Sequence, residues 1–283
     1  MNHQQQRPFA VVTGASSGIG FELAKVFAES GYDLLITAED VEIEAAHREL
    51  NQIAASVECA REDLSTEEGV ERLYARIQAT ARPVDAIALN AGIGAGGDFA
   101  RETDLRKELR LIDLNVRSTV QLCKLVARDM VARDEGRILF TSSIASTMPG
   151  SFQAVYNASK SFVQSFALAL RNELKDTGVT VTSLMPGPTE TEFFERAEML
   201  DTPIGEGPKD DPADVARQGF EALMDGKERV VSAGIKTKAQ AAAAKVLPDP
   251  VKAEMHRKQA QPPTAEEEDG EAQPAAAGER GER

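Results

Sequence analysis

Hydrophobic residues along this chain form short continuous runs that alternate with longer segments of helical periodicity. The short runs predict strands at residues 9–13, 33–38, 56–59, 85–90, 137–142, 179–185 and 229–233. The periodic segments predict helices at residues 20–30, 41–55, 66–80, 104–133, 154–177 and 212–225. Strands that are apolar throughout are buried on both faces, and helices between them supply the crossovers of a parallel sheet. The pattern therefore predicts an α/β fold, a doubly wound parallel sheet of seven strands with helices on both faces.

The composition changes near residue 246, after which proline, alanine and glutamate dominate. A segment of this kind has too little apolar surface to offset the entropy lost on ordering. We therefore predict a flexible lead at residues 1–7, one domain at residues 8–245 and a disordered tail at residues 246–283, with one marginal helix at 239–247. The tail is interpreted as a solubilising extension, and a partner-binding tail is the alternative.

The charge and the rare residue types argue against several functions. The chain carries 32 lysines and arginines against 46 aspartates and glutamates, a formal net charge of −14. Such an acidic protein is a poor ligand for nucleic-acid phosphates or anionic membranes, so we expect neither partner. Two cysteines cannot build a disulfide framework or a four-thiolate zinc site. Of the three histidines, only His47 lies where a catalytic triad or a histidine-rich metal site could use it, so we expect neither. No apolar segment has the length of a signal peptide or a membrane span, and we expect a cytoplasmic protein without a metal.

The first predicted strand is followed at once by a glycine-rich turn, Thr13-Gly14-Ala15-Ser16-Ser17-Gly18-Ile19-Gly20. Glycines bring the backbone close to a ligand without a Cβ in the way, and the next helix directs its free N–H groups toward the same point. A pyrophosphate suits that point. The strand before the turn and the helix after it favour nucleotide binding over an ordinary turn rich in glycine.

The TGxxxGxG spacing of this turn resembles the nucleotide-binding signature of the short-chain dehydrogenase/reductase family, which has a Rossmann fold. Further motifs of that family follow in its order between residues 9 and 233: Asp63-Leu64, Asn90-Ala91-Gly92, Asn115, Ser143, Tyr156-x-x-x-Lys160, and Pro186-Gly187 with Thr191. Leu89 stands where the family commonly has a second asparagine. The resemblance implies a cofactor site formed by Gly14, Ser16, Ser17, Gly18, Ile19, Gly20, Glu39, Asp63, Leu64, Asn90, Ala91, Gly92, Tyr156, Lys160, Pro186, Gly187, Thr189 and Thr191.

The candidate catalytic residues are Asn115, Ser143, Tyr156 and Lys160. Tyr156 and Lys160 are four residues apart on a predicted helix and therefore project from one face. We expect the Lys160 ammonium to lower the pKa of Tyr156, so that this phenol exchanges a proton with substrate near neutral pH. The resemblance further implies that Lys160 contacts the nicotinamide ribose, that Ser143 hydrogen-bonds the reacting oxygen, and that Asn115 supports Lys160 through an ordered water. Each residue alone also fits a structural role, and only their joint occurrence favours catalysis.

The cofactor preference depends on the turn after the second strand, Ala38-Glu39-Asp40. Acidic side chains suit the two hydroxyls of a ribose and repel a 2′-phosphate. By the resemblance, Ala38 stands where NAD-preferring relatives often carry aspartate, and Glu39 where NADP-preferring relatives often carry arginine. We therefore expect NAD(H) to be favoured, with NADP(H) as the alternative. The competing interpretation is that Glu39 and Asp40 only cap the next helix.

Residues 188–211 correspond to the substrate lid of the family. Apolar residues in this lid are Phe193, Phe194, Met199, Leu200 and Ile204, and Gly94–Gly97, Met148 and Phe152 are expected at the same cleft. They suggest a hydrophobic carbonyl or alcohol substrate, or they pack the lid onto the domain.

The predicted function is that of an NAD(P)-dependent oxidoreductase. It transfers a hydride between the nicotinamide and a carbonyl or secondary alcohol, with Tyr156 as the general acid and base. The alternatives are a non-catalytic dinucleotide-binding sensor with an acidic partner-binding tail, and a dehydratase or epimerase on the same scaffold. Relatives assemble through helices that correspond to residues 104–133 and 154–177, so we expect a homodimer or homotetramer.

Overall fold

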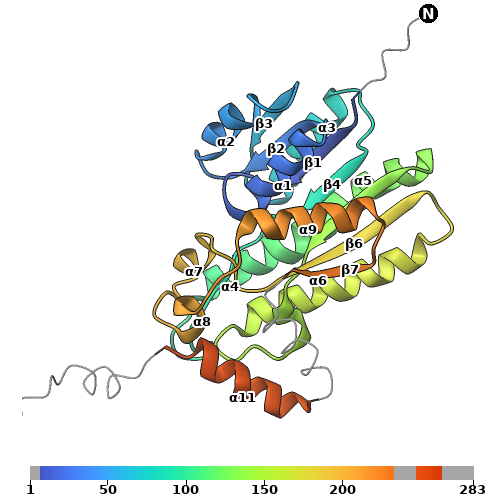
Figure 1. The fold of residues 1–283 in the computed structure, drawn as a ribbon. Coiled ribbons are helices and arrows are strands. Elements are labelled where there is room, and N and C mark those ends of the chain that lie inside the picture. The colour runs from blue at the N-terminus through green and yellow to red at the C-terminus, as the bar shows by residue number, and fades with distance from the viewer. Residues whose placement is uncertain (1–6, 233–246, 263–283) are drawn as a thin grey trace, which may run out of the picture.

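A single parallel sheet of seven strands organises the molecule (Figure 1). The computed structural model describes residues 7–232 and 247–262. The strands are β1 (Phe9–Thr13), β2 (Asp33–Ala38), β3 (Val57–Arg61), β4 (Ala86–Leu89), β5 (Gly136–Thr141), β6 (Val179–Pro186) and β7 (Arg229–Ser232). Their order is β3-β2-β1-β4-β5-β6-β7, which confirms the predicted doubly wound sheet. The chain reverses direction across the sheet between β1 and β4, and ligands of such folds bind at the carboxyl ends of strands beside this point.

Helices cover both faces of the sheet, and consecutive strand residues alternate between them. Ala10 and Val12 of β1 pack toward α1 (Gly18–Glu29), α2 (Ile43–Leu50) and α9 (Pro212–Met224). Phe9 and Val11 pack toward α3 (Glu67–Ala79), α5 (Thr119–Arg133) and α6 (Ala154–Glu173). All five residues of β1 are therefore buried, which is why the strand is apolar along its length.

The segment predicted as one helix at 104–133 is divided by a π-helical turn. It consists of α4 (Leu105–Ile112), the turn η1 (Asp113–Ser118) and α5. The hydroxyl of Thr119, the first residue of α5, donates to the carbonyl of Asn115 in this turn, 2.9 Å away. Single π-turns inside helices are frequent at functional sites, and this one contains the candidate residue Asn115.

The predicted tail is partly folded, so the expectation of disorder from residue 246 onward was wrong for residues 249–260. These residues form α11 (Asp249–Ala260), which contacts α8 (Pro203–Glu206) of the lid. His256 and Ala260 are buried, and Ala260 packs with Phe194, Ala197 and Met199. The helix is thus held by a few buried residues on one face, and the average composition of the segment does not predict them. The acidic stretch from 263 onward and all of the predicted helix at 239–247 except its last residue lie outside the described residues.

The lid itself is short and irregular. It contains α7 (Phe193–Arg196) and α8, and a parallel bridge between Thr189 and Asp210 joins its two ends. Within residues 7–232 and 247–262, none of the helices combines the length and apolar character needed to cross a membrane.

Candidate active site

One pocket gathers nearly all the residues that the sequence motifs predict. It lies at the carboxyl ends of the strands, next to the reversal between β1 and β4. The predicted residues lining it are Gly14, Ser16, Ser17, Gly18, Ile19, Gly20, Glu39, Asp63, Leu64, Asn90, Ala91, Gly92, Ser143, Tyr156, Lys160, Pro186, Gly187, Thr189 and Thr191. Asn115 is the predicted residue that does not line it.

The glycine turn between β1 and α1 requires its glycines for two separate reasons. Gly14 and Gly18 have φ angles of 66° and 55°, a conformation that costs little only for glycine. Gly20 is excluded from carrying a side chain by contact, because a Cβ there would lie 1.9 Å from the carbonyl oxygen of Gly14. The Asn90 amide stabilises this geometry by donating to the carbonyls of Thr13 and Gly14, at 3.2 and 3.3 Å.

The N-terminus of α1 faces the pocket, and the hydroxyl of its N-cap residue Ser17 donates to the Glu192 carboxylate of the lid at 3.4 Å. Ser17 makes no side-chain capping bond, and no acidic residue occupies the first turn. Free N–H groups and the positive end of the helix dipole therefore point toward the pocket. Turn, helix end and pocket together fit the pyrophosphate of a nicotinamide dinucleotide.

Tyr156 and Lys160 lie on α6 and are both buried, with 9% and 6% of their surfaces exposed. Burial raises the pKa of Tyr156 to about 12, against the lowering effect of a hydrogen bond with Ser143. The Lys160 ammonium lies 5.9 Å from the centre of the Tyr156 ring and donates to the carbonyl of Thr141, 3.0 Å away. Burial lowers the pKa of Lys160 to about 8. The expected lowering of the Tyr156 pKa by Lys160 was therefore wrong, because desolvation is the larger effect in the protein alone.

Ser143 follows β5 and begins the short helical turn η2 (Ile144–Thr147). Its hydroxyl accepts from the backbone N–H of Ala145 at 3.1 Å. This capping bond fixes the orientation of the Ser143 side chain, which lines the same pocket as Tyr156.

Asn115 acts behind the pocket wall. Its side chain holds both backbone groups of Ile93, accepting from the N–H and donating to the carbonyl, each at 2.9 Å. A Cβ at Gly92 would lie 3.0 Å from the Asn115 Oδ1 and 3.2 Å from the Lys160 Nζ. The Asn115 and Lys160 side chains therefore both lie where a side chain at Gly92 would project.

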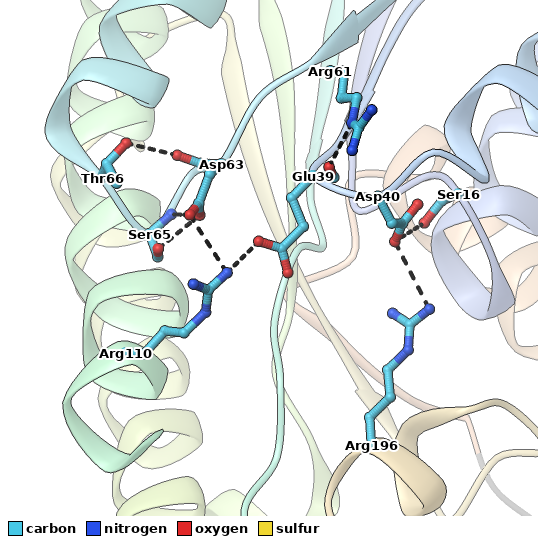
Figure 2. Close-up of polar contacts among 9 residues, drawn as sticks. All are labelled: Ser16, Glu39, Asp40, Arg61, Asp63, Ser65, Thr66, Arg110 and Arg196. Carbon is cyan, nitrogen blue, oxygen red and sulfur yellow. Dashed lines mark hydrogen bonds and ion pairs between the residues drawn. The ribbon is translucent and has the colours of Figure 1, made fainter. Parts of the chain in front are cut away.

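The part of the pocket lined by Ser16, Glu39, Asp40 and Asp63, which we call the adenosine end, contains ion pairs that could not be predicted from the sequence (Figure 2). Glu39 forms an ion pair with Arg110 of α4, and the same Arg110 Nη2 lies 3.5 Å from the Asp63 Oδ2. Asp40 points to the opposite side, where it accepts from the Ser16 hydroxyl at 3.0 Å and lies 3.8 Å from the Arg196 Nη2.

These contacts exclude the capping interpretation for Glu39 and Asp40. Helix α2 begins at Ile43 with Glu42 as its N-cap, and no side chain caps it. Asp63 accepts from the N–H and hydroxyl of Ser65, at 2.9 and 2.6 Å. Burial favours a higher pKa for Asp63, but the Ser65 bonds and the Arg110 charge hold this pKa below its usual value.

The lid and α11 complete the pocket with residues that no sequence motif marked. Arg196, His256 and Gln259 line it, together with the expected apolar residues Gly94, Met148, Phe193, Phe194 and Ile204. Six other expected residues do not line it, and three of them are Ala95, Gly96 and Gly97. Of the other three, Met199 is buried against α11, Leu200 is exposed, and Phe152 lies under the guanidinium of Arg257. In the described part of the chain, no cluster of three or more histidine, cysteine, aspartate or glutamate side chains has the geometry of a metal site.

Comparisons with known proteins agree with this geometry. The sequence matches the short chain dehydrogenase family over residues 8–199. It is 32% identical over 221 residues to an uncharacterized oxidoreductase of Staphylococcus saprophyticus, covering 77% of this chain and 92% of that protein. It is 34% identical over 180 residues to a probable NADP-dependent dehydrogenase of Haemophilus influenzae, covering 63% and 70%. A solved short-chain dehydrogenase from Sphingobium yanoikuyae, in complex with NADPH, is 26% identical, with a TM-score of 0.73 over 83% of this chain and 93% of that one.

The chain belongs to the short-chain dehydrogenase family. It is an NAD(P)-dependent oxidoreductase that acts on CH–OH or C=O groups of a small molecule. The alternative of a non-catalytic sensor is not favoured, because the relatives are named as dehydrogenases and oxidoreductases.

Proposed function

We propose that this protein reduces hydrophobic ketones or aldehydes, with Tyr156 as the proton donor. The observation that carries the proposal is that the buried Tyr156 and the half-buried Ser143 line one pocket with the glycine turn. With a pKa of about 12, Tyr156 stays protonated at neutral pH, which is the state that donates to a carbonyl oxygen. The bound cofactor supplies the hydride.

Three further residues support this step. Ser143 donates to the same carbonyl oxygen and stabilises its developing charge. Lys160, beside the phenol ring, counters the negative charge that Tyr156 acquires when it gives up its proton. Asn115 is a positioning residue, because it fixes the backbone of Ile93, which follows Gly92 near the Lys160 ammonium. A water between Asn115 and Lys160 is part of the proposal.

The substrate class follows from the pocket wall. Met148, Phe193, Phe194 and Ile204 give an apolar surface, and the Phe193 ring lies 5.1 Å from the Tyr156 ring. A carbonyl with apolar substituents would bury those substituents against this wall.

We propose NAD(H) as the preferred cofactor. Four carboxylates, of Glu39, Asp40, Glu62 and Asp63, line the adenosine end, and they favour ribose hydroxyls over a 2′-phosphate. The Haemophilus relative is named as NADP-dependent and the Sphingobium protein binds NADPH, so this preference separates the chain from both.

We further propose a cytoplasmic homodimer or homotetramer. Cys59 and Cys123 are free thiols, which suits a reducing compartment. Leu105 and Leu109 of α4 and Phe162 of α6 expose 65%, 50% and 43% of their surfaces, and a second copy would cover such residues. Light scattering during gel filtration measures the number of copies.

The decisive test is the variant Tyr156→Phe, assayed on a panel of apolar ketones and aldehydes with both cofactors. Loss of the donor should lower kcat by about 10² to 10⁴, while the dissociation constant for cofactor changes little. Tyr74→Phe is the matched control, because the Tyr74 hydroxyl binds Asp129 outside the pocket, at 2.8 Å. Undiminished turnover in Tyr156→Phe would overturn the proposal.

A further inference from the structure

Three arginines from separate elements converge on the acidic adenosine end of the pocket (Figure 2). Arg61 ends β3, Arg110 lies on α4 and Arg196 ends α7. No arginine or lysine occurs in the turn Ala38-Glu39-Asp40 itself. The positive charge at this end therefore comes from tertiary structure.

Glu39 is held by two of these arginines. Its carboxylate pairs with Arg110, and its backbone carbonyl accepts from the Arg61 Nε at 2.9 Å. Arg110 also lies 3.5 Å from Asp63, a second carboxylate of the same pocket wall. Arg110 thus bridges two carboxylates, and Glu39 is the nearer one.

The ion pair between Glu39 and Arg110 is exposed enough for Arg110 to exchange its partner. The Glu39 and Arg110 side chains are each 44% exposed, so their ion pair contributes little to folding. A guanidinium has five N–H donors and binds phosphate oxygens in the same planar geometry as a carboxylate. If the Glu39 carboxylate is removed, Arg110 keeps only the more distant contact with Asp63.

We propose that Arg110 is a latent ligand for the 2′-phosphate of NADP(H), which Glu39 keeps paired and therefore unavailable. The inference rests on the proposed preference for NAD(H). Glu39 has two effects on NADP(H): its own charge repels the phosphate, and its carboxylate pairs with the Arg110 guanidinium that would bind that phosphate. Cofactor choice in this chain is then set by an ion pair between β2 and α4 rather than by the β2 turn alone.

Calorimetric titrations of NADH and NADPH test this, with the full chain and a set of four variants. Glu39→Ala should tighten NADPH binding by about tenfold or more, and Glu39→Ala with Arg110→Ala should lose that gain. Glu39→Ala with Arg110→Lys should give an intermediate gain, since lysine keeps the charge but not the planar fork. Thermal melts establish that each variant is folded.

Glu58→Ala is the matched control. Glu58 lies on the same strand as Arg61 and its removal changes the net charge equally, but it is outside the pocket lining and its partner is Arg76, at 3.6 Å. Glu58→Ala should therefore leave the NADPH affinity within about twofold.

The wild-type titrations and the Arg110 variants test different claims. The wild-type comparison tests the proposed function, and tighter NADPH than NADH binding would overturn the NAD(H) preference. The Arg110 cycle tests the inference, and an equal NADPH gain in Glu39→Ala with and without Arg110 would overturn it.

Discussion

The two ends of the cofactor pocket are built in different ways. At the nicotinamide end, Tyr156 and Lys160 come from one helix and are at least nine-tenths buried. At the adenosine end, Glu39, Asp63 and Arg110 come from three separate parts of the chain and are 35–44% exposed. Local spacing defines the first group, whereas the second group exists only after the chain has folded.

This difference changes how charge behaves in each place. Desolvation dominates at the buried end, where it raises the pKa of Tyr156 and lowers that of Lys160. At the exposed end, solvent screens the ion pairs, and side chains can exchange partners at low cost. We therefore expect substitutions at the buried end to change catalysis and substitutions at the exposed end to change cofactor preference.

The largest expected effect on cofactor affinity comes from the glycine turn between β1 and α1. In Gly20→Ala the new Cβ would lie 1.9 Å from the Gly14 carbonyl oxygen and 2.5 Å from the Asn90 Nδ2, so the turn must shift. A displacement of about 1 Å in a positioned site can cost a factor of about 10² in activity. We expect NADH and NADPH to bind more weakly by about the same factor.

Gly31→Ala is its control at the other end of α1. Nothing lies within 4 Å of a Cβ at Gly31, although its φ of 88° makes the variant about 1–2 kcal/mol less stable. Cofactor affinity should be retained. Normal cofactor affinity in folded Gly20→Ala would contradict the role given to the turn.

The next effect separates cofactor from substrate. Ala260 is buried between α11 and the lid, so Ala260→Asp introduces a charge among Phe194, Ala197 and Met199 and should detach α11. We expect KM for the carbonyl substrate to rise about tenfold while the dissociation constant for NADH stays constant. Lys258→Asp, on the exposed side of the same helix, should change neither constant. Equal effects of the two substitutions would show that α11 does not shape the substrate pocket.

The same contrast explains what could be predicted from the sequence. The seven strands, the glycine turn and the Tyr156–Lys160 pair follow from hydrophobic pattern and short spacings, and the structure brings them together. Arg110 could not be assigned because its partner Glu39 is 71 residues away. The π-turn at Asn115 leaves the apolar periodicity almost unchanged, and α11 was hidden in a segment whose average composition resembles a disordered tail.

The smallest expected effect concerns the buried Lys160, whose pKa of about 8 lies below its ordinary value of 10.5. Between these values the unfolded chain binds more protons than the folded chain, so the free energy of unfolding rises with pH. Below pH 8 both states are protonated, and the full cost of burying the charge remains. We expect the wild type to gain about 1–2 kcal/mol relative to Lys160→Met between pH 7.5 and 9.5.

Urea unfolding at several pH values measures this difference, with Lys124→Met, an exposed lysine on α5, as the control. The range ends at pH 9.5 because Tyr156, with its raised pKa, makes the slope opposite in sign above pH 10. Lys160→Met also removes the bond to the Thr141 carbonyl, but that loss is the same at every pH and only offsets the curve. Parallel curves for wild type and Lys160→Met would mean that Lys160 is solvated like an exposed lysine. The buried and exposed ends of the pocket would then not differ in the way that their geometry implies.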